Sequence, residues 1–285
     1  MVFLTLFLLI MLPIVLAYHQ VGGRKTLGIT WITSAQFERQ MIWLAEAGYR
    51  TSSLTDYLNN NHAIAGKKIV LTFDDGFRAL AKNALPVLQR FGFTATVYPV
   101  ADYVGRENRW DVNFFGRRTM HLDWDELRDM LAAGWEIGSH SLRHAYLPSL
   151  SEAELYDDLR RSREILEDHL NIPIRHLSLP FGRGNHPVFE AARQAGYHTV
   201  ATLGQRQDNL AGQIPSAERR GLMIVPRRGI YLHDTLNSFQ RRVETGGDSK
   251  REYLRQRAIS FFSTGTIVVK AFGKLGGAMK KRLEI

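Results

Sequence analysis

The chain contains no cysteine, and that absence excludes three kinds of site. A disulfide scaffold, a thiolate zinc site and a cysteine nucleophile all require this side chain. A metal ion bound by this protein must therefore be held by histidine, aspartate or glutamate side chains, which the sequence supplies as ten His and 28 acidic residues.

Low-complexity sequence and internal repeats are also absent, and no tract rich in Pro, Gly or Ser indicates a linker before about residue 245. A chain of 285 residues that is 45% apolar has the size and composition of a globular protein. We therefore expect one folded domain over residues 13–245, preceded by an apolar segment at 1–12 and followed by a basic tail at 246–285.

The body of the chain has little excess charge of either sign. The net charge is +9, and residues 250–285 supply most of it, with nine Lys and Arg against two Glu. A nearly neutral body lacks the basic surface that binds nucleic acid, so no nucleic-acid partner is expected. The tail mixes lysines with apolar residues and could contact an anionic membrane surface, or it could pack on the domain as an ordinary helix.

No Lys or Arg precedes the apolar run from Met1 to Ala17. This run could be a cleaved signal peptide, a short membrane anchor or, over residues 13–18, a buried strand. The β-branched residues in Pro13–Tyr18 favour the strand. On that interpretation the protein is membrane-associated through its termini or cytoplasmic, rather than cleaved and secreted.

Short apolar runs alternate with amphipathic segments along the body of the chain. Strands are expected at 68–73, 94–100, 135–138, 174–179 and 198–202, and helices at 36–47, 79–91, 124–133, 151–170 and 187–195. Most of these helices end at a glycine, which is typical of helix C-termini in repeated strand–helix units around a parallel sheet. In such folds the reactive side chains gather at the carboxyl ends of the strands.

Two of these strand ends carry polar clusters. The strand at 68–73 leads into Asp74 and Asp75, which would lose hydration there without an obvious partner. They could share the work of a site, one binding a cation and the other acting as a base, or they could cap the helix that follows. The strand at 135–138 leads to His140 and His144, whose i, i+4 spacing on a helical turn would let both bind one metal ion together with a strand-end Asp.

The two clusters match the diagnostic motifs of a known family. Thr72–Gly76 (TFDDG) and His140–His144 (HSLRH) resemble those of polysaccharide deacetylases, the nodulation-protein homology domain of the carbohydrate esterases. The segment Leu179–Gly182 (LPFG) resembles a third motif, and the similarity covers roughly residues 13 to 240. The resemblance implies a single-domain α/β fold, a distorted (β/α)7 barrel.

The resemblance also implies roles for particular residues. Asp75, His140 and His144 would hold one divalent metal ion, with zinc favoured over cobalt, nickel or another divalent ion. Asp74 would be the general base, and the backbone N–H of Phe181 would stabilise the oxyanion.

The chain departs from the family pattern beside Pro180. Many relatives carry there an arginine that orients the base, whereas this chain has none immediately before the proline. Arg227 or Arg228 could take that role, and the sequence does not choose between them.

The general acid has two candidates. Many relatives carry it in a late LxxH motif, which Ile230–His233 resembles. A permuted branch, the deacetylases of poly-β-1,6-N-acetylglucosamine, carries it in a Tyr-His pair after the first strand, which Tyr18-His19 resembles. We favour His19 and keep His233 as the alternative. If His19 is catalytic, cleavage after Ala17 would remove its strand, which argues against a cleaved signal peptide.

The expected activity is metal-dependent hydrolysis of N-acetyl groups from N-acetylhexosamine residues of a polysaccharide or glycan, with release of acetate. An O-acetyl esterase, a deformylase or a non-catalytic glycan-binding relative are the alternatives. Tyr103, Trp110 and Phe114 lie on an arginine-rich loop at 103–120 and could line a groove for the sugar or serve only in loop packing.

Overall fold

The computed structural model describes residues 14–23, 29–59, 67–109, 119–203 and 221–245. The apolar segment 1–12, the aromatic residues Trp110 and Phe114 and the basic tail 246–285 lie outside the described residues. The proposed domain boundaries and the membrane contact of the tail therefore stay predictions. In the described ranges no helix is both long enough and apolar enough to cross a membrane.

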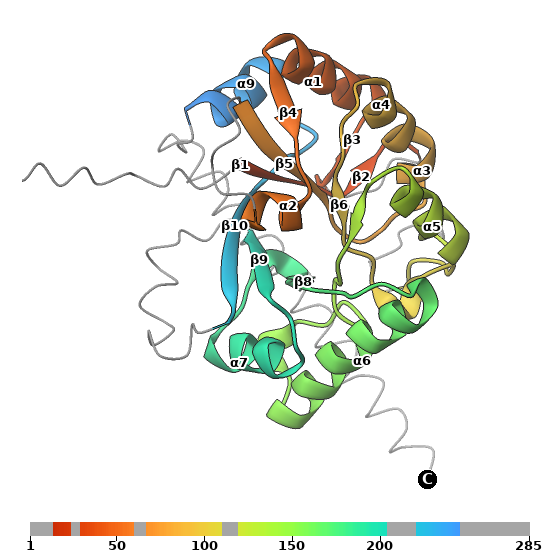
Figure 1. Ribbon diagram of the computed structural model, residues 1–285, viewed down its shortest axis with the longest axis vertical. Helices are drawn as coiled ribbons and strands as arrows, with labels where there is room; N and C mark the ends of the chain where they lie inside the picture. The colour runs from red at the N-terminus through yellow and green to blue at the C-terminus, as the bar shows by residue number, and fades with distance from the viewer. Residues whose placement is uncertain (1–13, 24–28, 60–66, 110–118, 204–220, 246–285) are drawn as a thin grey trace, which may run out of the picture.

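Seven parallel strands curl into a nearly closed barrel (Figure 1). Their order is β7 (Glu136–Ile137), β6 (Thr96–Val97), β5 (Lys67–Phe73), β1 (Ile14–Tyr18), β10 (Met223–Gly229), β9 (Thr199–Leu203) and β8 (His176–Ser178). Ser139, just beyond β7, closes the ring by a parallel bridge to Leu177 of β8. The expected distorted (β/α)7 barrel is confirmed.

Three further short strands of the described residues lie outside this ring. β4 (Tyr49–Thr51) pairs with the start of β5, and β2 (Gln20–Val21) pairs with β3 (Trp31–Ile32) in a separate two-stranded sheet. In the barrel, β1 lies between β5 and β10, and it pairs with β5 over its whole length. The residue after β1 therefore lies next to the residue after β5.

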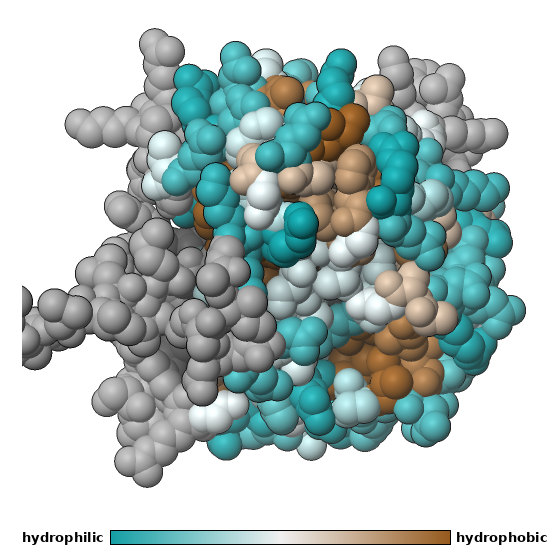
Figure 2. All heavy atoms as spheres, turned by 45° about the horizontal axis from the view of Figure 1, so that its top comes forward, coloured by the Kyte–Doolittle hydropathy of each residue, from teal (hydrophilic) through white to brown (hydrophobic). Residues whose placement is uncertain are grey.

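Helices surround the barrel, as Figure 1 shows. They are α1 (Ser34–Glu46), α3 (Ala79–Asn83), α4 (Leu85–Arg90), α5 (Trp124–Ala132), α6 (Glu152–Leu170), α7 (His186–Gln194) and α9 (Leu236–Glu244). Of these helices, α1, α5 and α6 begin with capping boxes, and in α6 the box is formed by Ser151 and Glu154. The face seen in Figure 2 is mainly hydrophilic, with apolar side chains gathered in smaller areas.

Alternation along the strands separates two cores. Outward side chains such as Leu16 and Leu71 join the large core beneath the helices. Inward side chains form a small second cluster with Leu54 of α2 (Leu54–Asn59): Val15, Val70, Tyr98, Ala201 and Val225. The backbone N–H of Leu54 and the hydroxyl of Thr55 bond to Glu136 and His176, the first residues of β7 and β8. α2 therefore lies at the amino-terminal end of the barrel and leaves the carboxyl end for polar groups.

The structure corrects several expected elements. The helix at 79–91 is two helices, α3 and α4, with the junction at Ala84, because Pro86 lacks the N–H that a continuous helix needs and is accommodated in the first turn of α4. The strand at 94–100 is reduced to the two residues of β6. Strand β10 was not predicted, since Pro226, Arg227 and Arg228 interrupt its apolar pattern.

Candidate active site

The candidate site lies at the carboxyl ends of the barrel strands, where alternation aims particular side chains inward. In β5, Val70 faces the interior, so Thr72 and then Asp74 face it as well. Asp74 is only 2% exposed and Asp75 only 7%. Neither caps the next helix, because the residue before α3 is Arg78 and that helix has no side-chain cap.

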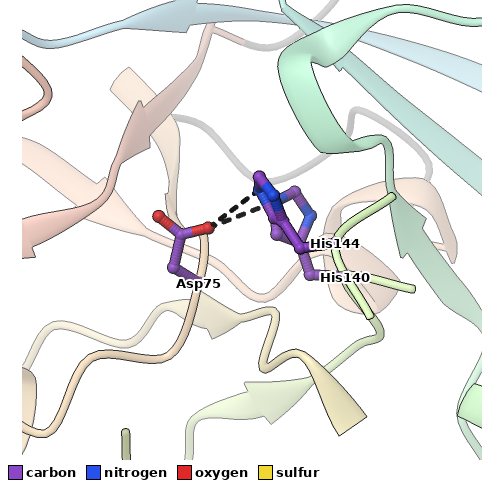
Figure 3. Close-up of side chains that lie close together, drawn as sticks. All are labelled: Asp75, His140 and His144. Carbon is purple, nitrogen blue, oxygen red and sulfur yellow. Dashed lines mark ion pairs between the residues drawn. The ribbon is translucent and has the colours of Figure 1, made fainter. Parts of the chain in front are cut away.

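Asp75, His140 and His144 converge on one point (Figure 3). The Oδ1 atom of Asp75 lies 3.4 Å from Nε2 of His140 and 3.3 Å from Nε2 of His144. Each residue offers one ligand atom, and these atoms all lie within 4.8 Å of one another. The Nδ1 atom of His140 lies 2.9 Å from the carbonyl oxygen of Ser178, which fixes the ring and leaves Nε2 for a metal.

The charges of this group suit a cation. Burial by itself would raise the pKa of Asp75, but the two imidazoles outweigh burial and hold that pKa well below its ordinary value. In the part of the chain that the structure describes, the buried Oδ1 atom accepts no hydrogen bond of good geometry. Among the described residues no further ligand joins the carboxylate and the two imidazoles, and such a set fits a divalent ion that keeps open coordination positions.

The histidine pair does not lie on a helical turn, which corrects the expected local structure. His140 to His144 form an irregular loop after β7, in which Ser141 and His144 have positive φ values of 67° and 54°. Asp75 and Phe181 also have positive φ, 67° and 61°. Such conformations are rare for residues other than glycine, and four of the five in the described chain gather around this site.

Asp74 is held by Arg227 from β10. Nη1 and Nη2 of Arg227 each donate to one carboxylate oxygen of Asp74, both at 2.7 Å, and the Ser178 hydroxyl donates to the same carboxylate at 2.9 Å. Burial by itself would raise the pKa of Asp74, but the charges of Arg227 and His140 and the Arg227 hydrogen bonds lower it to about 2. Asp74 is therefore ionised at any ordinary pH.

The structure separates the two arginine candidates. Arg227 is 3% exposed and inside the barrel, whereas Arg228 has the opposite parity on β10 and donates to the carbonyl oxygen of Arg242. Only Arg227 reaches Asp74.

The two candidate acids are also placed differently. His19 follows β1, and its Nε2 atom lies 4.0 Å from Oδ2 of Asp74. His233 is exposed in the turn after β10 and does not join the cluster. The geometry thus brings His19 and Asp74 together, as expected for residues that follow two paired strands.

The third motif lies in the turn η4 (Pro180–Gly182) after β8. The ring of Phe181 contacts the His144 ring edge-on, with 5.0 Å between centroids. A Cβ atom on Gly182 would lie 2.3 Å from the Cβ of Leu203, so only glycine fits at this position. This turn brings the ring of Phe181 beside His144, one of the metal-ligand candidates.

Three contributors to the site, Thr72, Ser178 and His121, were not predicted from the sequence. Thr72 and Ser178 each accept a hydrogen bond from Arg227, at 3.0 and 2.7 Å, and both could have been found from strand parity. His121 is buried, and its Nδ1 atom lies 2.9 Å from the carbonyl oxygen of Asp75. Tyr103, expected near the sugar, is half-buried with its ring 5.7 Å from that of His121.

Comparison with known proteins concerns the sequence and the fold of the chain. The sequence profile described as polysaccharide deacetylase matches residues 62–200. Over this region, just under half of its length, the chain is similar to the polysaccharide deacetylase family. The match runs from before β5 to the start of β9 and so contains TFDDG, HSLRH and LPFG. The strands that carry His19 and Arg227 lie outside it.

Two bacterial proteins are similar to this chain in sequence. YxkH of Bacillus subtilis (strain 168), named as a polysaccharide deacetylase, is 26% identical over 67% of this chain and 64% of its own length. A poly-beta-1,6-N-acetyl-D-glucosamine N-deacetylase of Staphylococcus aureus (strain MSSA476) is 23% identical over 58% of each chain. The matches span less than two thirds of either relative.

A solved structure shares the fold of this chain. The Streptococcus pyogenes deacetylase PplD, in complex with acetate, superposes with a TM-score of 0.66 over 82% of this chain and 98% of its own, at 21% sequence identity. At that identity the similarity concerns the fold alone.

Proposed function

We propose that this protein removes N-acetyl groups from N-acetylhexosamine residues of a glycan by metal-dependent hydrolysis and releases acetate. The observation that carries the proposal is the pairing of two acidic side chains with different partners. Asp75 lies with His140 and His144, whereas its neighbour Asp74 is held by Arg227. The name of the Staphylococcus aureus relative supports the choice of N-acetylglucosamine polymers as substrate.

Asp75, His140 and His144 are the residues that would hold the ion, and zinc is the first choice, with cobalt and nickel as alternatives. A divalent ion in such a set supplies Lewis acidity, which lowers the pKa of a coordinated water and stabilises negative charge on the substrate oxygen. The second nitrogen of His140 is bound to the Ser178 carbonyl, so its ring cannot turn away.

The chain's own groups would move the protons. Asp74 takes a proton from the attacking water, and Arg227 keeps its carboxylate ionised and oriented for that step. The backbone N–H of Phe181 stabilises the oxyanion of the tetrahedral intermediate. His19, as imidazolium, donates a proton to the departing nitrogen, because an amide nitrogen cannot leave as an anion.

Acetate release is the measurement that tests the proposal. The purified protein is incubated with N-acetylated hexosamine oligomers, with O-acetylated and N-formylated counterparts, and with a chelator followed by Zn²⁺, Co²⁺ or Ni²⁺. We expect acetate from the N-acetyl substrates, loss with chelator and recovery with metal. Release only from esters, or only of formate, would replace the proposed reaction, and release from no substrate would favour a binding protein.

The two acid candidates are tested by alanine substitution at each. His19→Ala is expected to lower kcat by about 10²- to 10⁴-fold, the usual effect of losing a general acid. His233→Ala, which removes an exposed side chain outside the cluster, should leave kcat within about twofold. A larger loss in His233→Ala than in His19→Ala would reverse the assignment.

A further inference from the structure

We infer that Asp158 of α6 is a positioning residue for the metal site, because it fixes the loop that carries His140 and His144. The inference rests on the proposed function, since it concerns the residues proposed to hold the ion. Asp158 lies 14 residues beyond His144 in the sequence and belongs to none of the three motifs. It acts through the loop backbone rather than on the metal or the substrate.

Asp158 is bound to the middle of that loop. Its side chain is buried, with 8% of the residue exposed, and its Oδ1 atom accepts a hydrogen bond from the backbone N–H of Leu142 at 2.9 Å. Leu142 lies halfway between His140 and His144. A shift of Leu142 would therefore change the distance and angle between the two imidazoles.

The loop needs such support because its own conformation is unfavourable. Ser141 and His144 both have positive φ, which is tolerated only when the surroundings determine it. Two backbone hydrogen bonds hold the loop from one side: the N–H groups of Ala101 and Asp102 donate to the carbonyl oxygens of Ser141 and Leu142 at 3.2 and 3.0 Å. Asp158 holds Leu142 from α6, on its N–H side.

A second contact from α6 reaches the start of the same segment. Ser162 lies one helical turn after Asp158, and its hydroxyl accepts a hydrogen bond from the Ser139 hydroxyl at 3.0 Å. Ser139 directly precedes His140. Because residues four apart share a helix face, one face of α6 holds both the beginning and the middle of the loop.

Without its hydrogen bond to Leu142, the buried position of Asp158 would lower the stability of the fold. It lies on the buried face of α6 among Leu155, Leu159 and Leu166, where a carboxylate loses hydration. Its neighbour Asp157 points outward and pairs with Arg160 at 2.9 Å. The two adjacent carboxylates on one helix thus offer a matched pair of test positions.

The affinity of the protein for Co²⁺ tests the inference without an activity measurement. Metal-free wild-type protein, Asp158→Ala, Asp158→Asn and Asp157→Ala are titrated with Co²⁺, and binding is followed by its visible absorption, well below the unfolding temperature of each variant. We expect Asp158→Ala to weaken Co²⁺ binding by about 10- to 100-fold, the range known for residues that orient metal ligands, and to alter the Co²⁺ spectrum. Asp158→Asn keeps an acceptor oxygen for Leu142 and should stay within about threefold of wild type, as should Asp157→Ala.

The possible outcomes separate the two proposals. Wild-type affinity and spectrum in Asp158→Ala would overturn the inference alone, and so would an equal loss in Asp158→Asn, which would indicate an effect of charge instead of position. A wild-type protein that binds no Co²⁺ would overturn the proposed function and this inference together. If Asp158→Ala does not fold, Asp158→Ser, too short to reach the Leu142 N–H, replaces it with the same expected loss.

Discussion

At the scale of single residues, Asp74 and Asp75 are adjacent carboxylates whose surroundings differ. Asp74 faces a guanidinium that binds both of its oxygens, and Asp75 faces two imidazoles. A base must stay ionised and oriented until it takes a proton, which the guanidinium favours, whereas a metal ligand must share its oxygen with the ion. The two partners therefore suit the two acids to different tasks.

Asp74→Asn tests this division. The amide keeps the shape of the side chain but cannot accept a proton, so we expect kcat for acetate release to fall by at least about 10²-fold. Co²⁺ affinity should stay within a few-fold of wild type, because Asp74 is not among the proposed ligands. Retained turnover would show that another group is the base.

The two neighbouring arginines of β10 give a second test. Arg227→Lys replaces the bidentate hydrogen bonding to Asp74 with a single donor group. We therefore expect kcat to fall by about 10- to 100-fold even though the positive charge remains. Arg228→Lys, on the outward face of the same strand, should leave kcat nearly unchanged. Steady-state kinetics give kcat for the two variants. An equal fall of kcat in both would contradict the assignment of Arg227 as the residue that orients Asp74.

Which of these residues could be predicted depends on their distance from a motif. The acids and the histidine pair were predicted because TFDDG and HSLRH contain them. The sequence could not show which of Arg227 and Arg228 points toward Asp74. That depends on the alternation of side chains along β10, and this strand was not predicted because Pro226 interrupts its apolar pattern. Asp158 resembles any other acidic residue on a charged helix until its contact with Leu142 is seen.

At the scale of elements, the turn after β8 is tightly confined. Gly182 has a φ of +67°, and a Cβ there would meet both the side chain and the backbone of Leu203 at less than 3.0 Å. Neither the backbone conformation nor the space admits another residue, so the turn that presents Phe181 depends on this glycine.

A comparison of Gly182→Ala with Gly92→Ala separates the cost of the positive φ from the cost of the crowded Cβ position. Gly92 has a similar φ of +62° but no atom within 4 Å of a Cβ, so its substitution should cost only about 1 kcal/mol of unfolding free energy. Gly182→Ala should cost about 1–3 kcal/mol more, from overpacking, and should also lower acetate release. Urea denaturation of both variants measures the difference, and equal costs would contradict the crowding.

Elements could be predicted where the apolar pattern and a capping residue indicate the same helix boundary. For α6 the predicted start at Ser151 is the observed N-cap. β6 was overestimated because its apolar run continues beyond Val97, where Pro99 supplies no N–H for a strand partner. α2 was not predicted because its burial depends on the barrel interior rather than on helical periodicity. Its buried residue, Leu54, packs against side chains inside the barrel.

At the scale of the whole molecule, a buried polar network ties α2 to the barrel. Glu136 of β7 accepts hydrogen bonds from the backbone N–H groups of Leu54 and Thr55 at 3.0 and 3.3 Å. Its other oxygen lies 3.1 Å from Nε2 of His176. The carboxylate thus holds the amino-terminal end of α2 against two strands on the far side of the barrel from the candidate site.

This network predicts a pH-dependent stability. Burial would raise the pKa of Glu136, but the hydrogen bond and charge of His176 and the Thr55 and Thr96 hydrogen bonds lower it from 4.5 to about 2. A lowered pKa stabilises the fold above pH 4.5, and this contribution, up to about 3 kcal/mol, is lost as the pH falls toward 2.

Urea denaturation of Glu136→Gln and wild type at pH 3 to 7 measures this contribution. The difference in unfolding free energy should be largest at pH 6 to 7 and should shrink below pH 4.5. Glu164→Gln, on the exposed face of α6, is the control and should change stability little at any pH. A difference for Glu136→Gln that is the same at pH 3 and pH 7 would contradict the role of its charge.

The position of β1 between β5 and β10 has a consequence for the newly synthesised protein. Among the described strands β1 emerges first from the ribosome and β10 last, yet they are neighbours in the barrel. β1 and β5 can pair early, but the guanidinium that neutralises Asp74 emerges only 153 residues after it. A nascent chain that stops short of Arg227 would have to keep this carboxylate hydrated, so the barrel is expected to remain open on that side until translation has passed its final strand.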